Sequence, residues 1–445
     1  MQVAPWLPQT IKLVSHPKAR DQSVATTQIK AGSSILTTPA FASILLDSEK
    51  GRRCDNCFRL PQDKPLRRCT GCGSYWYCNA ECQNVQWRKH HKRICKTINV
   101  FTVSPGYQAL PLHEKHDSIL LSHVIAQMSF SSTPYSLEDS SLTSVFLSLL
   151  PHADDSVTAP VICPIKPPPP AHLLQTLYTR FGNNNFAIHS HLNTIGHGIF
   201  PIASRLFNHS CLPNAAAKYH LSPDQSVVME IVALQEIQPG EQICLPYLDP
   251  ALLQTRQQIL EISYGFKCRC PSCSFLNRAE PLPEPPIDPK ELSNREIQLR
   301  NFVGFVLRTG VELPKISIET TLPALRCFLR ESYMADLSNQ FRDASHESQY
   351  DLAFESGITL LSLYLLVYPE NYPQIGMHLL ELAKTSWNRR ISSPDLPETQ
   401  DTEIKSQVQV FLSAASRVLT VLGEEGDDDG PLKEIAVLER LLSEE

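Results

Sequence analysis

Cysteine and histidine residues crowded into positions 54–95 are the clearest sign of chemistry in this sequence. They form four pairs: Cys-x-x-Cys twice, then Cys-x-x-x-Cys and His-x-x-x-Cys. A Cys-x-x-Cys turn aims two thiolates at one tetrahedral ion, and a pair spaced four residues apart does so from one helix face. Four such pairs usually interleave around two zinc ions. The sequence therefore predicts one site made by Cys54, Cys57, Cys78 and Cys82, and a second made by Cys69, Cys72, His91 and Cys95.

Two adjacent histidines leave one ligand of the second site open. His90 and His91 are neighbours, and either ring could bind the ion. His91 is the preferred ligand because it lies four residues before Cys95, so that both side chains project from the same face of a helix.

A polar stretch at positions 208–214, Asn-His-Ser-Cys-Leu-Pro-Asn, is the next candidate site. It follows an apolar run at 199–202, and its residue types favour turns over helices or strands. Taken alone, the stretch fits an ordinary turn as well as a site. It gains weight because Tyr247 ends a strand-like run downstream and is followed by the triplet Cys268-x-Cys270-x-x-Cys273.

The elements that must position these side chains can be read from the hydrophobic pattern. Residues 227–233 and 243–247 read as strands on either side of a turn at 238–241. Beyond residue 290 apolar residues recur at helical spacing, and Pro369 and Pro373 break this pattern before helices at 376–387, 403–422 and 432–442. The acidic run 424–429 reads as a solvated loop. Proline-rich stretches at 160–170 and 281–289 read as connectors, the second being a domain boundary.

Size and composition limit the class of protein. The chain of 445 residues is 42% apolar and 19% charged, with a formal charge of −6. These values describe a soluble protein of two or three domains that is not basic throughout. The apolar run at 360–368 is too short to cross a bilayer, and residues 1–10 lack the pattern of a secretory signal. We expect a protein of the nucleus or cytoplasm, without membrane association or disulfides, and a monomer.

The cysteine-rich segment resembles a MYND zinc finger. Tyr77-Cys78, Cys82-Gln83, Trp87 and His91-Lys92 fall where that family keeps such residues, although the distance from Trp87 to Cys95 is one residue longer than usual. Fingers of this family mostly bind proline-containing peptides, so the resemblance implies partners of that kind. The segment is also rich in Lys and Arg, which makes nucleic acid a secondary candidate partner.

The polar turn, Tyr247 and the Cys triplet occur in the order kept by SET and MYND (SMYD) protein-lysine methyltransferases, and the chain resembles that family over nearly its whole length. The resemblance implies a multidomain α+β protein, in which a finger splits a β-rich SET fold and an all-α domain similar to tetratricopeptide repeats follows. The implied units are a SET N-terminal portion (1–49), the finger (50–97), an insert (98–175), a SET C-terminal portion (176–250), a post-SET zinc segment (251–275), a linker (276–289) and a helical domain (290–445).

The same resemblance implies roles for single residues. Tyr247 would be the catalytic tyrosine, next to the methyl group that S-adenosylmethionine transfers to a lysine amine. Asn184, Asn208 and His209 would contact this cofactor, and Phe266 would pack against it or line the lysine channel. Desolvation in such a channel lowers the pKa of the amine, which must be neutral to react. A third structural zinc ion would be shared by Cys211, Cys268, Cys270 and Cys273.

The family's Gly-x-Gly turn at the cofactor entrance is missing. Counting back from Gly32, the first glycine of the chain, places Arg20 and Gln22 where those glycines belong. Their side chains would crowd the cofactor or shift the backbone. Lys18 or Arg20 could pair with the carboxylate of the cofactor, whereas Asp21 would repel it. The leading hypothesis is a protein-lysine N-methyltransferase of histone or non-histone substrates, and the alternative is a weak or inactive adaptor that recruits protein partners.

Overall fold

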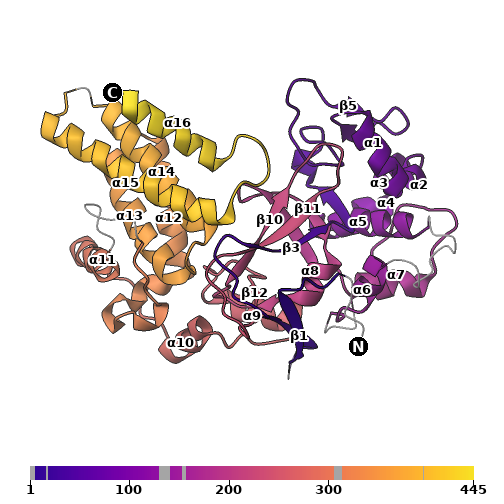
Figure 1. Cartoon of the computed structure of the whole chain (residues 1–445), viewed down its shortest axis with the longest axis horizontal. Coiled ribbons are helices and arrows are strands. Elements are labelled where there is room, and N and C mark those ends of the chain that lie inside the picture. The colour runs from indigo at the N-terminus through magenta and orange to yellow at the C-terminus, as the bar shows by residue number, and fades with distance from the viewer. Residues whose placement is uncertain are drawn as a thin grey trace.

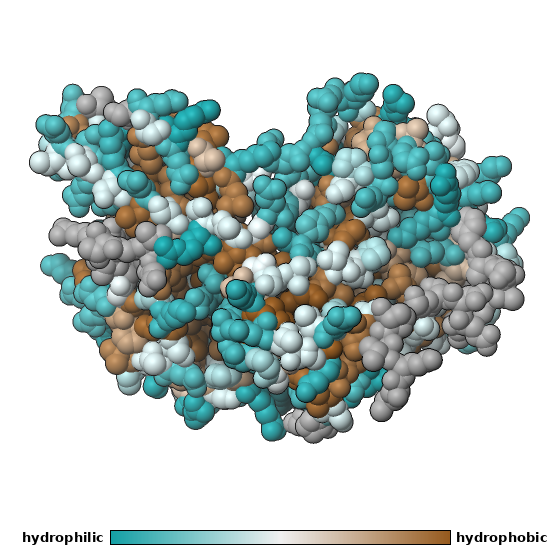
Figure 2. Space-filling view, in the orientation of Figure 1, coloured by the Kyte–Doolittle hydropathy of each residue, from teal (hydrophilic) through white to brown (hydrophobic). Residues whose placement is uncertain are grey.

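A β-rich centre separates a cysteine-rich lobe from a helical lobe (Figure 1). The structure is a computed structural model that describes residues 6–16, 19–129, 141–152, 157–304, 313–393 and 395–444. Its mixture of small sheets and many helices confirms the α+β class. The boundaries between the units stay predictions. Figure 2 shows that the molecular surface is hollowed between the helical lobe and the finger.

Short strands form several small sheets in the centre. β11 lies between β10 and β3, and β8 lies between β4 and β7, with all neighbours antiparallel. The strand expected at 227–233 is confirmed as β11, whereas the one expected at 243–247 is only the two-residue β12, which ends before Pro246. The strands are β1 (Ile11–Ser15), β2 (Asp21–Ala25), β3 (Ser34–Pro39), β4 (Ala42–Leu45), β5 (Arg67–Arg68), β6 (Trp76–Tyr77), β7 (Asn185–Ser190), β8 (Asn193–Ile199), β9 (Asn208–His209), β10 (Ala215–His220), β11 (Val228–Ala233) and β12 (Cys244–Leu245).

A glycine on β8 lets the centre and the cysteine-rich lobe meet closely. A Cβ atom at Gly196 would lie 2.4 Å from the carbonyl oxygen of Ile44 on β4 and 2.6 Å from the ring of Phe58. Phe58 is fully buried and comes from the finger. The finger therefore packs directly onto the central sheet, and a side chain at position 196 would force the two apart.

The finger and the insert share one apolar core. Helix α1 begins after Asn79, whose side-chain oxygen accepts the N–H of Cys82. It continues into a π-helical turn, Trp87–His91 (η2), and a turn of this kind takes in one residue more than an α-helical turn. The longer spacing between Trp87 and Cys95 is absorbed there. The helices here and in the centre are η1 (Asp47–Glu49), α1 (Ala80–Gln86), α2 (Lys92–Ile94), α3 (Ile98–Thr102), α4 (Pro105–Gln108), α5 (Leu112–Met128), α6 (Ser141–Leu147), α7 (Ala171–Tyr178) and α8 (Pro201–Leu206).

In the helical lobe, α12 to α16 pack against one another in sequence order. The break expected at Pro369 and Pro373 is confirmed, because α13 ends at Val367 and Pro373 is the first residue of α14, where its missing N–H costs no hydrogen bond. The apolar run at 360–368 belongs mostly to α13, which by length and composition could cross a membrane but is 67% buried within the protein. The elements are α9 (Thr255–Tyr264), α10 (Pro271–Ala279), α11 (Pro289–Val303), η3 (Ile318–Thr320), η4 (Pro323–Leu329), α12 (Glu331–His346), α13 (Tyr350–Val367), α14 (Pro373–Ile391), α15 (Glu398–Leu422) and α16 (Pro431–Glu444).

The acidic loop between α15 and α16 joins the three parts of the molecule, so the expectation of a solvated loop is wrong for residues 423–428, which we call the strap. The Asp427 carboxylate accepts hydrogen bonds from Arg53 of the finger at 2.5 Å and from Ser190 of β7 at 2.9 Å. The Gly426 N–H donates to the carbonyl of Tyr219 on β10 at 2.9 Å. Lys218 of β10 donates to the last carbonyl of α15 at 2.7 Å. Charges that looked free in the sequence are thus used within the chain.

Candidate active site and three zinc sites

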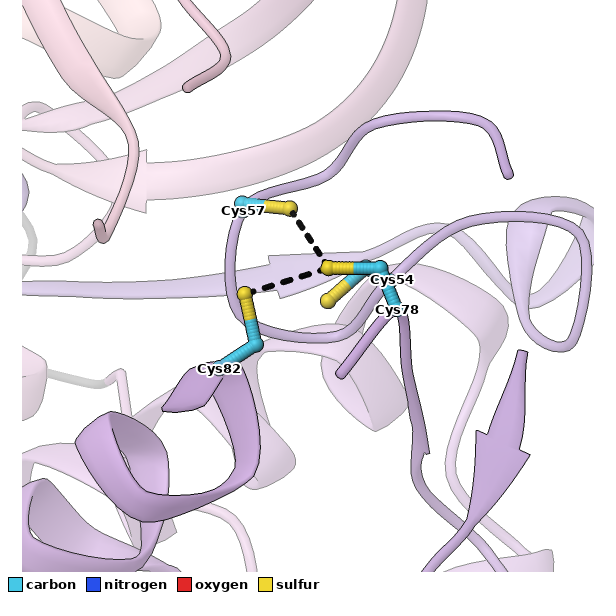
Figure 3. Close-up of side chains that lie close together, drawn as sticks. All are labelled: Cys54, Cys57, Cys78 and Cys82. Carbon is cyan, nitrogen blue, oxygen red and sulfur yellow. Dashed lines mark hydrogen bonds between the residues drawn. The ribbon is translucent and has the colours of Figure 1, made fainter. Parts of the chain in front are cut away.

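The first predicted zinc site is assembled from two turns of the finger and the start of α1. The sulfur atoms of Cys54, Cys57, Cys78 and Cys82 face one another (Figure 3). The Sγ atom of Cys78 lies 3.8 Å from that of Cys57 and 3.3 Å from that of Cys82. A tetrahedral ion with Zn–S distances of about 2.3 Å holds its sulfur ligands about 3.8 Å apart, so this geometry fits zinc and excludes disulfides.

The second group brings together His91, the preferred ligand, and three cysteines, and His90 lies outside it. The Nε2 atom of His91 lies 3.4 Å from the Sγ atom of Cys69 and 3.6 Å from that of Cys72, and Cys95 completes the group. Burial lowers the pKa of His91 to about 4, so the ring is neutral, as a zinc ligand must be. The ring of His90 instead stacks on His123, with 3.9 Å between ring centroids.

The third group joins the polar turn to the post-SET segment. The Sγ atom of Cys211 lies 3.8 Å from that of Cys268 and 3.5 Å from that of Cys273, and Cys270 completes the set. The cluster pins the start of α10 against the turn after β9. Each of the three groups offers four protein ligands, which complete the coordination of a tetrahedral ion and are typical of structural zinc.

The polar turn is more regular at its start than the sequence indicated. Asn208 and His209 form β9, which pairs in parallel with β12. The Nδ1 atom of His209 accepts the N–H of Tyr247 at 3.0 Å, so the proton of the ring is on Nε2, which lies 3.1 Å from the Sγ atom of Cys211. His209 therefore couples Tyr247 to the third zinc site. Both ring nitrogens are engaged, which leaves its ring face and backbone for a cofactor.

Four rings gather beside this turn. Tyr247 lies 5.3 Å from His209 and 5.0 Å from Tyr264, measured between centroids, and Phe266 lies 6.0 Å from His209. The hydroxyl of Tyr247 donates to the carbonyl of Phe207 at 2.7 Å, and burial raises its pKa, so it stays neutral. Sequence reasoning missed Tyr264. The sequence feature that could have identified Tyr264 is an aromatic residue near the end of a helix, two positions before Phe266.

The segment that replaces the glycine turn is fixed in place by several contacts. Its backbone carbonyl at Asp21 accepts the side-chain N–H of Asn208 at 2.9 Å, and the carboxylate of Asp21 pairs with Arg205 of α8. Arg20 is turned away, with its guanidinium donating to the carbonyl of Ser148 at 2.7 Å. Asp21 is thus neutralised within the chain. Lys18, the other cation considered for the cofactor carboxylate, lies outside the described residues.

Asn184 makes no described hydrogen bond to the other predicted cofactor residues. Its side-chain amide donates to the carbonyl of Arg180 at 2.8 Å, and none of its described hydrogen bonds reaches Asn208 or His209. The guanidinium of Arg180 binds the carbonyls of Leu147 and Leu149, on either side of the residue that receives Arg20. The segment 147–149 therefore links the surroundings of Asn184 to the start of β2. The cofactor roles of these residues stay predictions.

Comparisons with known proteins agree with this arrangement. A SET domain model matches residues 24–248, just over half of the chain. The human N-lysine methyltransferase SMYD2 is 29% identical over 330 residues, which make up 71% of this chain and 65% of that protein, slightly less than two thirds of its length. N-lysine methyltransferase SMYD2-A of Danio rerio is 26% identical over 410 residues, 84% of this chain and 88% of that protein. The crystal structure of the SET domain of LSMT bound to lysine and AdoHcy aligns with 99% of this chain and 89% of that one, at 14% identity and a TM-score of 0.25.

A β-rich centre with the polar turn, Tyr247 and the third cysteine group defines a SET protein. The chain therefore belongs to the SET domain family, and it is similar to SMYD members of that family.

Proposed function

We propose that this protein is a protein-lysine N-methyltransferase that uses S-adenosylmethionine. The observation that carries the proposal is the group of His209, Tyr247, Tyr264 and Phe266, packed beside Asn208 and held by the third cysteine cluster. Such aromatic walls strip water from a lysine side chain, which lowers the pKa of its amine and leaves it neutral and nucleophilic. S-adenosylmethionine, when bound, would supply the methyl group as a sulfonium.

Tyr247 would orient the amine. Its hydroxyl proton is committed to the carbonyl of Phe207, so the lone pairs of its oxygen remain to accept an N–H of the amine. A neutral hydroxyl positions the amine without charging it, and positioning can supply much of the rate of a transfer. Asn184, Asn208 and His209 would contact the cofactor, and Phe266 would pack against it or line the lysine channel.

The competing proposal is an adaptor without catalytic power. It is favoured by one observation: the chain has Arg20 and Gln22 in place of two glycines, with Asp21 of this segment tied to Arg205. In an adaptor these contacts would fill the space that the cofactor needs. The finger and the helical lobe would then be the working surfaces.

Two measurements separate the proposals. Calorimetric titration with S-adenosylmethionine should show binding to the wild type. Absence of binding at millimolar ligand would contradict the methyltransferase proposal and favour the adaptor. With labelled S-adenosylmethionine and a panel of histones and cell-lysate proteins, Tyr247→Phe should lower the methylation rate about 10- to 100-fold. Tyr333→Phe is the matched control, because its hydroxyl bonds only Glu296 among the described contacts, in the helical lobe. Equal losses in both variants would argue against the role of Tyr247.

We further propose that the finger is a MYND module that recruits proline-containing peptides. Leu60 and Trp87 support this proposal because each is more than a third exposed on the finger, and exposed apolar side chains suit proline rings. Nucleic acid remains the secondary partner, since Arg53 and Arg59 of the finger are already paired with strap carboxylates. We propose a monomer of the nucleus or cytoplasm.

A further inference from the structure

A buried arginine beside the third cysteine cluster has no acidic partner among the described residues. Arg256 is 1% exposed. Its guanidinium donates to the carbonyl of Pro250 and to the hydroxyl of Ser272, each at 2.7 Å, and its Nε atom has no acceptor in the described part of the chain. No described carboxylate lies within 4.0 Å of it. Burying an uncompensated cation costs on the order of several kcal/mol, so its charge must be offset in another way.

The helix that carries Arg256 adds to this cost. Arg256 is the second residue of α9, and the dipole of a helix places partial positive charge at its first turn. The other arginine buried beside zinc ligands is in a different situation. Arg53 precedes Cys54, but its guanidinium faces the carboxylates of Glu49 and Asp427.

The cysteine cluster supplies the negative charge that Arg256 lacks. Ser272, which accepts from the guanidinium, lies in the sequence between the ligands Cys270 and Cys273. Four thiolates around one Zn²⁺ carry a net double negative charge. The guanidinium therefore contacts the short segment that carries two of the four ligands of the cluster.

We propose that Arg256 is the counter-charge of the post-SET zinc site. The guanidinium offsets the excess charge of the zinc–thiolate cluster, and the cluster offsets the buried guanidinium. Because α9 starts beside Arg256 and ends at Tyr264, the same pairing fixes the helix that brings Tyr264 to the aromatic group. Arg256 is thus a positioning residue, and its role does not depend on the proposed methyltransferase activity.

Charge and shape can be separated with two substitutions in the full chain. Native mass spectrometry should count three zinc ions in the wild type, one for each group, and a chromogenic chelator measures how fast they are released. Arg256→Gln should lose the post-SET ion or release it about 10- to 100-fold faster, whereas Arg256→Lys should retain three ions. The control is Arg330→Gln, because Arg330 lies in the helical lobe and pairs with Glu284. This variant should match the wild type in zinc content and release rate. Equal zinc content and equal release rates in the Gln and Lys variants at position 256 would overturn the proposal.

A second pair of variants tests the same charge without removing the arginine, in case Arg256→Gln does not fold. Ser272→Asp places a competing carboxylate against the guanidinium, whereas Ser272→Ala removes the hydroxyl and adds no charge. The Asp variant should release the post-SET ion at least tenfold faster than the Ala variant. Equal rates in these two variants would contradict the proposal.

Discussion

Glu425 of the strap should make the protein less stable as the pH rises. Burial is the main reason that its pKa is raised from 4.5 to about 7, although backbone N–H groups, among them that of Leu192, act in the opposite direction. A carboxyl group whose pKa is raised in the folded state favours folding when it is protonated. This contribution is fully present below pH 4.5 and is lost as the pH rises through about 7. The shift corresponds to about 3 kcal/mol in the free energy of unfolding.

The substitution Glu425→Gln removes this titration while keeping a side-chain oxygen that can accept the N–H of Leu192. The variant should be more stable than the wild type by about 3 kcal/mol at pH 8 and by less than about 1 kcal/mol at pH 5. Urea unfolding followed by circular dichroism at both pH values measures the difference. The neighbouring exposed residue offers a matched control, Glu424→Gln.

Asp427, another carboxylate of the strap, does not mask the effect. Burial acts to raise the pKa of Asp427, but hydrogen bonds from Arg53 and Leu60 outweigh it and lower the pKa. The contribution of Asp427 to the free energy of unfolding is therefore present above the pKa of its unfolded state and is constant between pH 5 and 8. A difference between wild type and Glu425→Gln that is the same at both pH values, or a variant that is less stable at pH 8, would refute the reasoning.

Two further changes test the packing of the finger and its second zinc site. Gly196→Ala should lower the free energy of unfolding by about 3 kcal/mol, because the new Cβ would lie 2.4 Å from the carbonyl oxygen of Ile44. Thermal unfolding measures this loss. Gly106→Ala is the mild control, because its Cβ would meet only Val161, at 3.8 Å. His91→Ala should lose one of three zinc ions in native mass spectrometry and His90→Ala none, and loss of an ion from the His90 variant would reverse the ligand assignment.

Local spacing was enough to predict the ligand pairs of the finger, whereas Cys211 was joined to the Cys triplet only through the family resemblance. Cys-x-x-Cys pairs and the His91–Cys95 pair are set by one turn of chain or one turn of helix, so their geometry is independent of the rest of the fold. The same holds for β11, whose run of β-prone residues is continuous. What the sequence missed depends on distant segments. The role of Tyr264 appears only when α9 folds back on Tyr247, and Asn208 becomes a strand residue only because β12 lies beside it.

Charges were read least well from the sequence. The basic finger looked like a surface for outside partners and the acidic loop like a solvated segment, yet Arg53 and Asp427 bind each other. Asp21 seemed to face a cofactor carboxylate without compensation, but Arg205 pairs with it. Sequence separation hides such pairs, because an ion pair between distant residues leaves no periodic pattern in the sequence.

The bond between Arg53 and Asp427 joins residues 374 positions apart, and this has a consequence for how the protein is made. A ribosome completes the finger long before it reaches the strap, so Asp427, one ion-pair partner of the finger, is synthesised much later than the finger itself. Until then Glu49 is the one described carboxylate that pairs with the guanidinium of Arg53, and Lys218 has no carbonyl of α15 to which it can donate a hydrogen bond. A message cut short before residue 423 would therefore yield a chain with all twelve zinc ligands and with a helical lobe still bonded to the centre, for example through Asn371 and the carbonyl of Leu234, but without the ion pair that joins this lobe to the finger.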